Sequence, residues 1–227
     1  MKAEQPKRKE VLKSFLEKFD ISTLNPMQTE ARKAIYAGND VAVLSPTGSG
    51  KTLAFLLPII ERLDPNLSEV QALVLVPSRE LAMQIEQVAR KLGSGFKINA
   101  VYGGRSGALD KADLKHRPAL LIGTPGRIAD RFRRDDIDLT RIKTLVLDEF
   151  DKAIELGFEK DISAIIDELY SVEKRVLISA TQQEDLELPS FTKMPDPEIL
   201  KFIGEKRNEG TLSQFYIRAE DSDKLEI

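Results

Sequence analysis

The sequence of 227 residues contains no cysteine, no tryptophan and a single histidine, His116. Without cysteine the chain has no disulfide framework and no thiolate that could bind a metal or act as a nucleophile. One histidine also argues against zinc chemistry and histidine-based catalysis, and His116 lies in a basic segment, residues 115–118, which is typical of an exposed turn. These absences exclude disulfide-stapled proteins and thiol-dependent enzymes.

Basic charge and aromatic residues are also scarce. The formal net charge is −3, and aromatic residues make up 6% of the sequence. The overall charge therefore gives no indication of a nucleic-acid-binding protein, and an aromatic platform for single-stranded bases is not expected. A nucleic acid would have to be bound by local loops rather than by a general basic face.

Long apolar runs are absent as well. No stretch approaches the length needed to span a bilayer, and the charged residues 1–10 lack the apolar centre of a secretory signal. We therefore expect a cytoplasmic protein that does not interact with a membrane. Hydrophobic residues at 41% and charged residues at 31% are typical of a globular protein with one large domain or two small ones.

Short runs rich in Val, Ile and Leu alternate with stretches of helical spacing. Strands are predicted at residues 41–44, 72–76, 98–102, 119–122, 144–147 and 175–178, and helices at 53–60, 79–92, 128–133 and 152–169. Most of the predicted strands are continuously apolar, as expected for strands that helices bury on both faces. The pattern predicts an α/β fold with an open, mostly parallel, doubly wound sheet.

The last part of the sequence differs in character. Residues 204–210 are polar and flanked by glycines, which is typical of a linker, and residues 213–217 have the pattern of a new strand. We expect a charged N-terminal extension over residues 1–14 and a nucleotide-binding domain over 15–207. Residues 208–227 are expected to be an interdomain linker and the start of a second domain.

The most specific motif occupies residues 45–52, between the first predicted strand and a helix. Its glycines allow backbone N–H groups to turn around an oxyanion, and the helix that follows adds its positive N-terminal end. Lys51 can reach the terminal phosphates, and the Thr52 hydroxyl can bind Mg²⁺. The general pattern begins with glycine where this chain has Ser45, and the alternative is an ordinary turn with a solvated lysine. The predicted nucleotide-binding residues are Ser45, Thr47, Gly48, Ser49, Gly50, Lys51 and Thr52.

Three carboxylates, Asp148, Glu149 and Asp151, follow the predicted strand at 144–147. An acid at a strand end beside a phosphate loop can hold Mg²⁺, and Asp148 fits that role. Glu149 is then placed to orient and deprotonate a water for attack on the γ-phosphate. The alternative is a helix N-terminus enriched in acids for capping. In combination with the phosphate loop we favour the catalytic interpretation.

Further strand ends carry loops that suit a nucleic-acid backbone. Each loop alone is most simply a turn with a helix cap, but together they place hydroxyls, backbone N–H groups and two arginines on one rim. Such groups bind phosphate and sugar oxygens without reading sequence. After the last predicted strand, Ser179 and Thr181 could bond the acidic loop. The rim residues are Pro77, Ser78, Arg79, Gly103, Gly104, Thr124, Pro125, Gly126 and Arg127.

From about Phe15 to its end, the chain resembles the first RecA-like domain of DEAD-box ATP-dependent RNA helicases. Residues 45–52 are similar to motif I, 77–81 to motif Ia, 148–151 to motif II and 179–181 to motif III. Residues 103–104 and 124–127 match the family's glycine pair and motif Ib. Gln28 resembles the glutamine that recognises the adenine edge. The resemblance implies a RecA-like P-loop NTPase fold with ATP and Mg²⁺ as cofactors.

The resemblance also implies roles and partners. Lys51 and Thr52 would hold phosphates and Mg²⁺, while Asp148 would hold Mg²⁺ through water. Glu149 would activate the attacking water, and Asp151 would link the nucleotide state to motif III. The rim would bind the RNA backbone without sequence preference. The implied partners are RNA and a second RecA-like domain of the same, monomeric protein.

Two departures from the family pattern concern the nucleotide site. Phe150 stands where the family name has alanine, so a bulky ring must fit beside the acidic loop. Ile21 occupies the place of an aromatic residue that packs on adenine. The family's second domain also supplies arginine fingers, which are worth about 10³–10⁵ in rate. We therefore expect the chain alone to bind nucleotide weakly, hydrolyse it very slowly and unwind nothing.

The sequence leaves three alternative functions open. The first is an ATP-gated RNA clamp without productive unwinding, which Phe150 keeps open. The second is a DNA-acting helicase of a neighbouring family, because only the resemblance favours RNA. The third is a P-loop NTPase unrelated to nucleic acids, which leaves the rim loops unexplained.

Overall fold

The computed structural model describes residues 4–180 and 188–202. Thr181 and the predicted linker and strand after residue 203 lie outside the described residues. The described strands form one sheet in the order β3-β4-β2-β5-β6-β1-β7, and every pair in it is parallel. The strands are β1 (Val41–Leu44), β2 (Ala72–Leu75), β3 (Ile98–Val101), β4 (Leu120–Gly123), β5 (Thr144–Leu147), β6 (Lys174–Ser179) and β7 (Glu198–Lys201).

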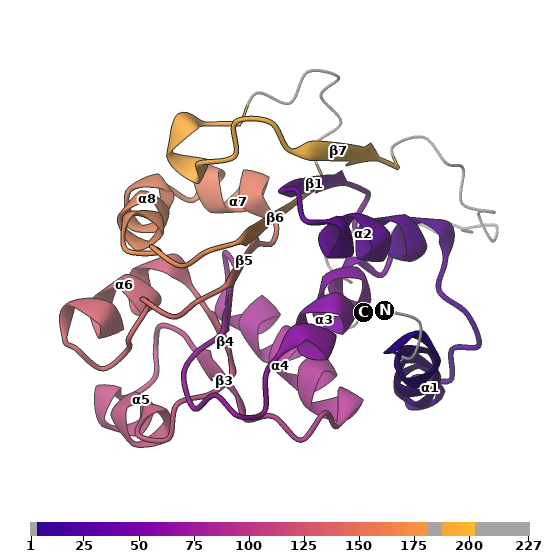
Figure 1. Ribbon diagram of the computed structural model, residues 1–227. Coiled ribbons are helices and arrows are strands. Elements are labelled where there is room, and N and C mark those ends of the chain that lie inside the picture. The colour runs from indigo at the N-terminus through magenta and orange to yellow at the C-terminus, as the bar shows by residue number, and fades with distance from the viewer. Residues whose placement is uncertain (1–3, 181–187, 203–227) are drawn as a thin grey trace, which may run out of the picture.

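Helices cover both faces of this sheet (Figure 1). One face carries α1 (Glu4–Glu17), α2 (Pro26–Ala37), α3 (Lys51–Arg62) and α4 (Arg79–Leu92). The other carries α5 (Gly107–Leu114), α6 (Pro125–Arg133), α7 (Phe150–Glu155), α8 (Glu159–Asp167) and the short 3₁₀ helix η1 (Ser190–Thr192). The expected doubly wound α/β fold is therefore confirmed.

Successive side chains of each central strand pack into two separate hydrophobic layers, one on each face of the sheet. In β1, Val41 and Val43 pack in the layer of α1–α4, while Ala42 packs in the layer of α5–α8. In β2, Val74 and Leu73 divide in the same way. Because both faces of each central strand are buried, these strands are continuously apolar rather than alternating.

The predicted helix over residues 152–169 is wrong in one respect, because the structure has two helices there. The first, α7, ends at Glu155, and α8 begins at Glu159. Between them Gly157 has φ +80°, a left-handed conformation that favours glycine and ends a helix. The predicted strands are confirmed to within a residue or two at each end.

Several elements lie outside the sequence prediction. Helices α1, α2 and α5 were not predicted, and neither was the edge strand β7, whose residues are mostly exposed. In α1, Phe15 and Leu16 are buried in the layer of α1–α4. No helix of the described residues is long and apolar enough to cross a membrane.

Candidate nucleotide site and nucleic-acid groove

The carboxyl ends of the parallel strands meet at one edge of the sheet, and the predicted motifs divide that edge into two halves. Strands β5, β6 and β1 are neighbours, so the acidic loop, Ser179 and the phosphate loop lie next to one another. Strands β2, β4 and β3 are also neighbours, and the three rim loops follow them. The sheet order therefore separates a nucleotide half from a rim half, with β2 and β5 paired between them.

Two glycines shape the phosphate loop. Gly48 has φ +70° and Gly50 has φ +86°, both in the left-handed region that side chains disfavour. Gly50 is the N-cap of α3, and a Cβ there would lie 2.4 Å from the Gln28 Nε2 atom. The loop therefore needs glycine at this position both for its conformation and for the close approach of the glutamine.

Helix α2 supports the loop from the side. Asn25 and Gln28 form a capping box, in which the Gln28 N–H donates to Asn25 Oδ1 and the Asn25 N–H donates to Gln28 Oε1. The remaining amide groups reach the loop, because Asn25 Nδ2 donates to the Ser49 carbonyl and Gln28 Nε2 to the Gly50 carbonyl. Asn25 was not a predicted site residue, although the Asn-x-x-Gln spacing of a capping box signals it.

Lys51 is the first residue of α3 and is almost fully buried. Its ammonium donates to the carbonyl of Ser45 at 2.8 Å and to that of Pro46 at 3.0 Å, so it closes the loop on itself. Burial lowers the pKa of Lys51, while the charges of Asp148, Glu149 and Asp151 act in the opposite direction. The acidic loop is thus electrostatically coupled to the phosphate-loop lysine.

The acidic loop begins with a deeply buried carboxyl group. Asp148 is 4% exposed, and its Oδ1 atom accepts from the Glu149 N–H at 3.0 Å. Burial raises the pKa of Asp148 to about 7, the neighbouring Glu149 charge adds to the effect, and Lys51 opposes it. Glu149 is half-buried and has φ +49°, an uncommon conformation for a side-chain-bearing residue.

The oxygen groups of this half fit a hard divalent cation. Within residues 4–180 and 188–202, no group of three or more His, Cys, Asp or Glu is placed to hold a metal by itself. Mg²⁺ differs from other metals in that one or two carboxylates suffice when phosphate oxygens and waters complete its shell. The buried carboxyl of Asp148 and the Thr52 hydroxyl would hold it.

The Phe150 ring points into the core. It is 6% exposed and packs in the layer of α5–α8, with its ring centroid 6.2 Å from that of Phe191. The predicted crowding is therefore accommodated by the hydrophobic layer below the acidic loop. Ser179 is buried on the neighbouring strand, opposite Leu44 in register, and its carbonyl accepts from the Ser45 N–H.

The rim loops converge on one groove of about 480 Å³. Ser78 caps α4 by accepting from the Leu81 N–H, and Thr124 is the N-cap of α6, with Pro125 in the first turn. Gly104 has φ +83°, and a Cβ there would lie 3.6 Å from an Arg79 nitrogen, so these two loops are adjacent. The groove is lined by Arg79, Gly103, Thr124, Gly126, Arg127, Asp130 and Phe158.

The two rim arginines differ in their surroundings. Arg79 is well exposed and pairs with Glu80. Arg127 is only 17% exposed and pairs with Asp110, which is fully buried, while it also donates to the Arg105 carbonyl. Arg79 can turn toward a phosphate at little cost, whereas the Arg127 guanidinium is held within the protein.

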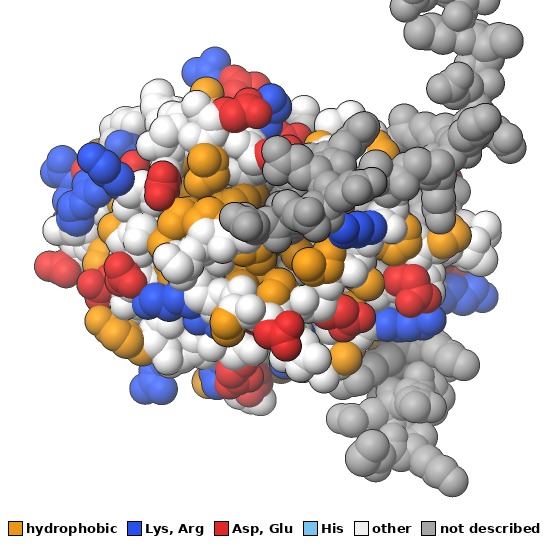
Figure 2. Space-filling model, turned by 90° about the horizontal axis from the view of Figure 1, so that it is seen from above, with side chains coloured by type: hydrophobic (Ala, Val, Ile, Leu, Met, Phe, Trp, Pro, Cys, Tyr) orange, Lys and Arg blue, Asp and Glu red, His pale blue; other side chains and the backbone are white. Residues whose placement is uncertain are grey.

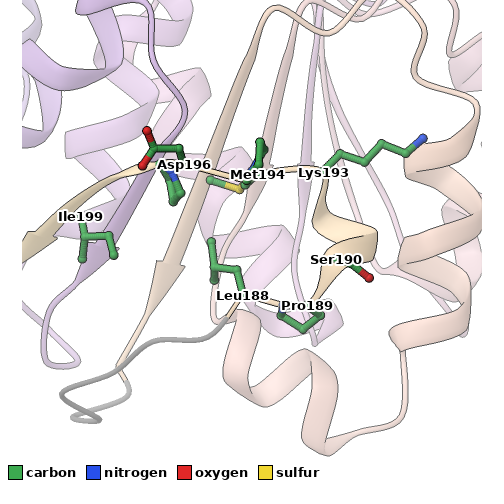
Figure 3. A pocket seen from close by; sticks show the side chains of 9 residues that line it. Leu188, Pro189, Ser190, Lys193, Met194, Asp196 and Ile199 are labelled. Atoms are coloured by element: carbon green, nitrogen blue, oxygen red, sulfur yellow. The ribbon is translucent and has the colours of Figure 1, made fainter.

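Surfaces away from these two halves carry none of the predicted site residues. One hollow lies between η1 and β7, where Leu188, Met194 and Ile199 form its apolar part (Figure 3). On the face seen from above β7, the described Lys and Arg side chains are interspersed with Asp and Glu (Figure 2). Several of the described Lys and Arg side chains gather at the left edge of the view, with acidic side chains beside them (Figure 2).

The fold and the phosphate loop define a P-loop nucleotide-binding domain of the RecA-like α/β type. A family model described as DEAD/DEAH box helicase matches residues 25–188. The chain therefore belongs to the DEAD/DEAH box helicase family.

Relatives agree with this assignment. The chain is 37% identical over 204 residues to the ATP-dependent RNA helicase CshA of Limosilactobacillus reuteri, covering 89% of this chain and 41% of that protein. It is 32% identical over 220 residues to the DEAD-box ATP-dependent RNA helicase CshA of Geobacillus kaustophilus, covering 96% and 47%. The chain thus spans less than half the length of these curated relatives.

A solved structure has the same fold. The crystal structure of a hypothetical ATP-dependent RNA helicase from Sulfolobus tokodaii superposes with a TM-score of 0.75 at 28% identity. The match covers 85% of this chain and 56% of that one.

Proposed function

We propose that this chain is the ATP- and RNA-binding domain of an ATP-dependent RNA helicase or RNA-remodelling ATPase. The observation that carries the proposal is the placement of the acidic loop beside the phosphate loop, close enough that Asp148 and Glu149 act on Lys51. Carboxylates and a phosphate-binding lysine brought together at one edge of the sheet, where only β6 separates β5 from β1, suit NTP hydrolysis. The names of the relatives point to the same activity.

The residues of the nucleotide half have separate roles. The backbone of residues 45–50 and the first turn of α3 would bind the phosphates, and Lys51 would exchange its two loop carbonyls for phosphate oxygens. Glu149 would accept a proton from the attacking water. Mg²⁺, held by Asp148 and Thr52, would neutralise charge on the phosphates.

The rim half would bind the RNA backbone. The exposed Arg79 offers charge, while the first turn of α6 offers the Gly126 N–H at the groove edge, since Pro125 has no N–H and those of Arg127 and Ile128 donate to the Thr124 carbonyl. Arg127 would shape the groove through Asp110 and share its guanidinium with a phosphate only in part. Asp151, Ser179 and Thr181 would couple the nucleotide state to the second RecA-like domain.

A second RecA-like domain would complete the enzyme. The relatives are more than twice as long as the part that this chain matches, which leaves room for such a domain. Because arginine fingers are worth about 10³–10⁵ in rate, we propose that the 227-residue chain alone hydrolyses ATP very slowly. The monomeric state and the cytoplasmic location remain predictions.

The test is ATP hydrolysis by this chain and by a chain extended to the relatives' length, with Glu149→Gln as the blank. Stimulation of the extended chain by single-stranded RNA alone, abolished in the blank, would support the proposal. Equal stimulation by DNA of the same sequence would favour a DNA-acting helicase, since the 2′-hydroxyl is what distinguishes the two. ATP-dependent RNA binding without duplex separation would favour the clamp.

A further inference from the structure

Phe202 lies beside the phosphate loop although it is more than 150 residues away in sequence. Strand β7 pairs with β1 so that Lys201 is opposite Leu44. The Phe202 N–H then donates to the Leu44 carbonyl at 2.8 Å, which fixes the backbone of Phe202 next to the start of the loop. The position is therefore set by the sheet itself and not by a loop.

The half-buried Phe202 ring forms one wall of a pocket of about 260 Å³. The other walls come from the start of α2 and from the phosphate loop. None of the described side chains that line the pocket is charged. They are Asn25, Pro26, Met27, Ser45, Pro46, Gly48, Ser49 and Phe202.

This chemistry suits a flat, uncharged group that is tethered to phosphates. A nucleotide bound at the loop carries such a group in its base, and an aromatic ring offers a stacking face for it. Ile21, the residue expected at the base, packs with the hydrophobic layer of α1–α4, as Phe202 also does, but only Phe202 is among the described lining residues.

Gln28 is the other candidate for contact with the base, but its amide group is already hydrogen-bonded within the protein. Both ends of the Gln28 amide are engaged, the oxygen by the Asn25 N–H and the nitrogen by the Gly50 carbonyl. Gln28 is also buried and does not line the pocket. Phe202 is the aromatic side chain that the structure places there.

We propose that Phe202 is the stacking platform for the base of the bound nucleotide. The proposal rests on the proposed function, because it needs a nucleotide at the phosphate loop. Stacking is tolerant of base identity, since every base has a π-face. Phe202 therefore increases the affinities for ATP and for GTP by the same factor, and any preference for ATP over GTP comes from other residues.

The experiment measures binding of ATP, GTP and tripolyphosphate, each with Mg²⁺, by calorimetry. Phe202→Ala is expected to weaken ATP and GTP about tenfold, at the lower end of base–aromatic stacking, and to leave tripolyphosphate unchanged. Phe202→Tyr keeps the ring and should bind like the unmodified chain. Phe96→Ala is the matched control, because Phe96 is also half-buried in the same hydrophobic layer but precedes β3, at the opposite edge of the sheet.

Phe202→Trp gives an independent readout. The chain has no other tryptophan, so its fluorescence would report the pocket alone, and stacking by ATP or GTP should quench it while tripolyphosphate should not. If the unmodified chain binds ATP and Phe202→Ala binds it equally well, the assignment of Phe202 is wrong and the proposed function stands. If the unmodified chain binds neither ATP nor tripolyphosphate, both are wrong.

Discussion

Replacing Asp148 by asparagine should stabilise the chain, and more so at high pH. Because burial raises the pKa of this carboxyl from 3.8 to about 7, the folded state holds the proton more tightly than the unfolded state does. Between pH 4 and pH 7 the folded state therefore binds more protons, and the free energy of unfolding falls as pH rises. Asparagine has no such proton, and its amide oxygen can still accept from the Glu149 N–H.

The size of the effect follows from linkage. One pKa unit corresponds to about 1.4 kcal/mol, so ionised Asp148 costs the fold up to about 4 kcal/mol above pH 7. At pH 5 the carboxyl is still protonated in the folded state but already ionised in the unfolded state, so the loss of stability is only about 2 kcal/mol. The stability advantage of Asp148→Asn should therefore grow by about 2–3 kcal/mol between pH 5 and pH 8.

The assay is urea unfolding of both proteins at pH 5, 6, 7 and 8, with a chelator to remove divalent cations. A single histidine and no cysteine keep the background of other titrating side chains low in this range. Asp196→Asn, which removes an exposed carboxylate, controls for the loss of one negative charge. A difference between Asp148→Asn and the unmodified chain that does not change with pH would refute the argument from burial.

Three further substitutions test the structure by urea unfolding. Gly50→Ala should cost more than about 2 kcal/mol, because the strain of the left-handed backbone adds to a clash with Gln28. Gly38→Ala, at φ +111° with nothing within 4 Å, measures the backbone strain without a clash. Equal losses of stability in the two variants would contradict the clash at Gly50. Phe150→Ala should cost about 3 kcal/mol although it introduces the alanine that the family resemblance predicts there, and a loss below about 1 kcal/mol would show that the ring is not packed. Asp110→Asn should cost several kcal/mol because it removes the buried carboxylate charge that pairs with Arg127 and leaves that guanidinium only the 3.5 Å ion pair with Asp130; a neutral result would mean that the buried pair is not formed.

The sequence predicts most of the fold because burial on both faces leaves a local signal. Strands such as β1 and β5 are short apolar runs, and their bounds could be predicted to the residue. Strand β7 could not, because Glu198 and Lys201 make an exposed edge strand polar, and its pairing with β1 spans more than 150 residues. The break between α7 and α8 had a signal in Gly157, which was outweighed by the helical spacing on either side.

The candidate site divides in the same way. Residues that act through local geometry, such as Gly50 and Lys51 at the start of a helix, could be found from their spacing. Phe202 could not, because only the sheet brings it to the phosphate loop. The pairing of Arg127 with Asp110 was also beyond the sequence, since two opposite charges 17 residues apart have no pattern that distinguishes a buried pair from a solvated one.

Phe150 has a consequence for Glu149, the proposed general base, which precedes it. Glu149 is held at φ +49°, a conformation that costs roughly 1 kcal/mol for a residue with a side chain and persists only where its neighbours are fixed. On one side Asp148 is fixed at the end of β5, where its N–H donates to the Leu75 carbonyl. On the other side the Phe150 ring is buried against Phe191. An alanine would bury far less surface than this ring, so the phenylalanine anchors the start of α7 more strongly and holds the Glu149 backbone in the conformation that the acidic loop requires.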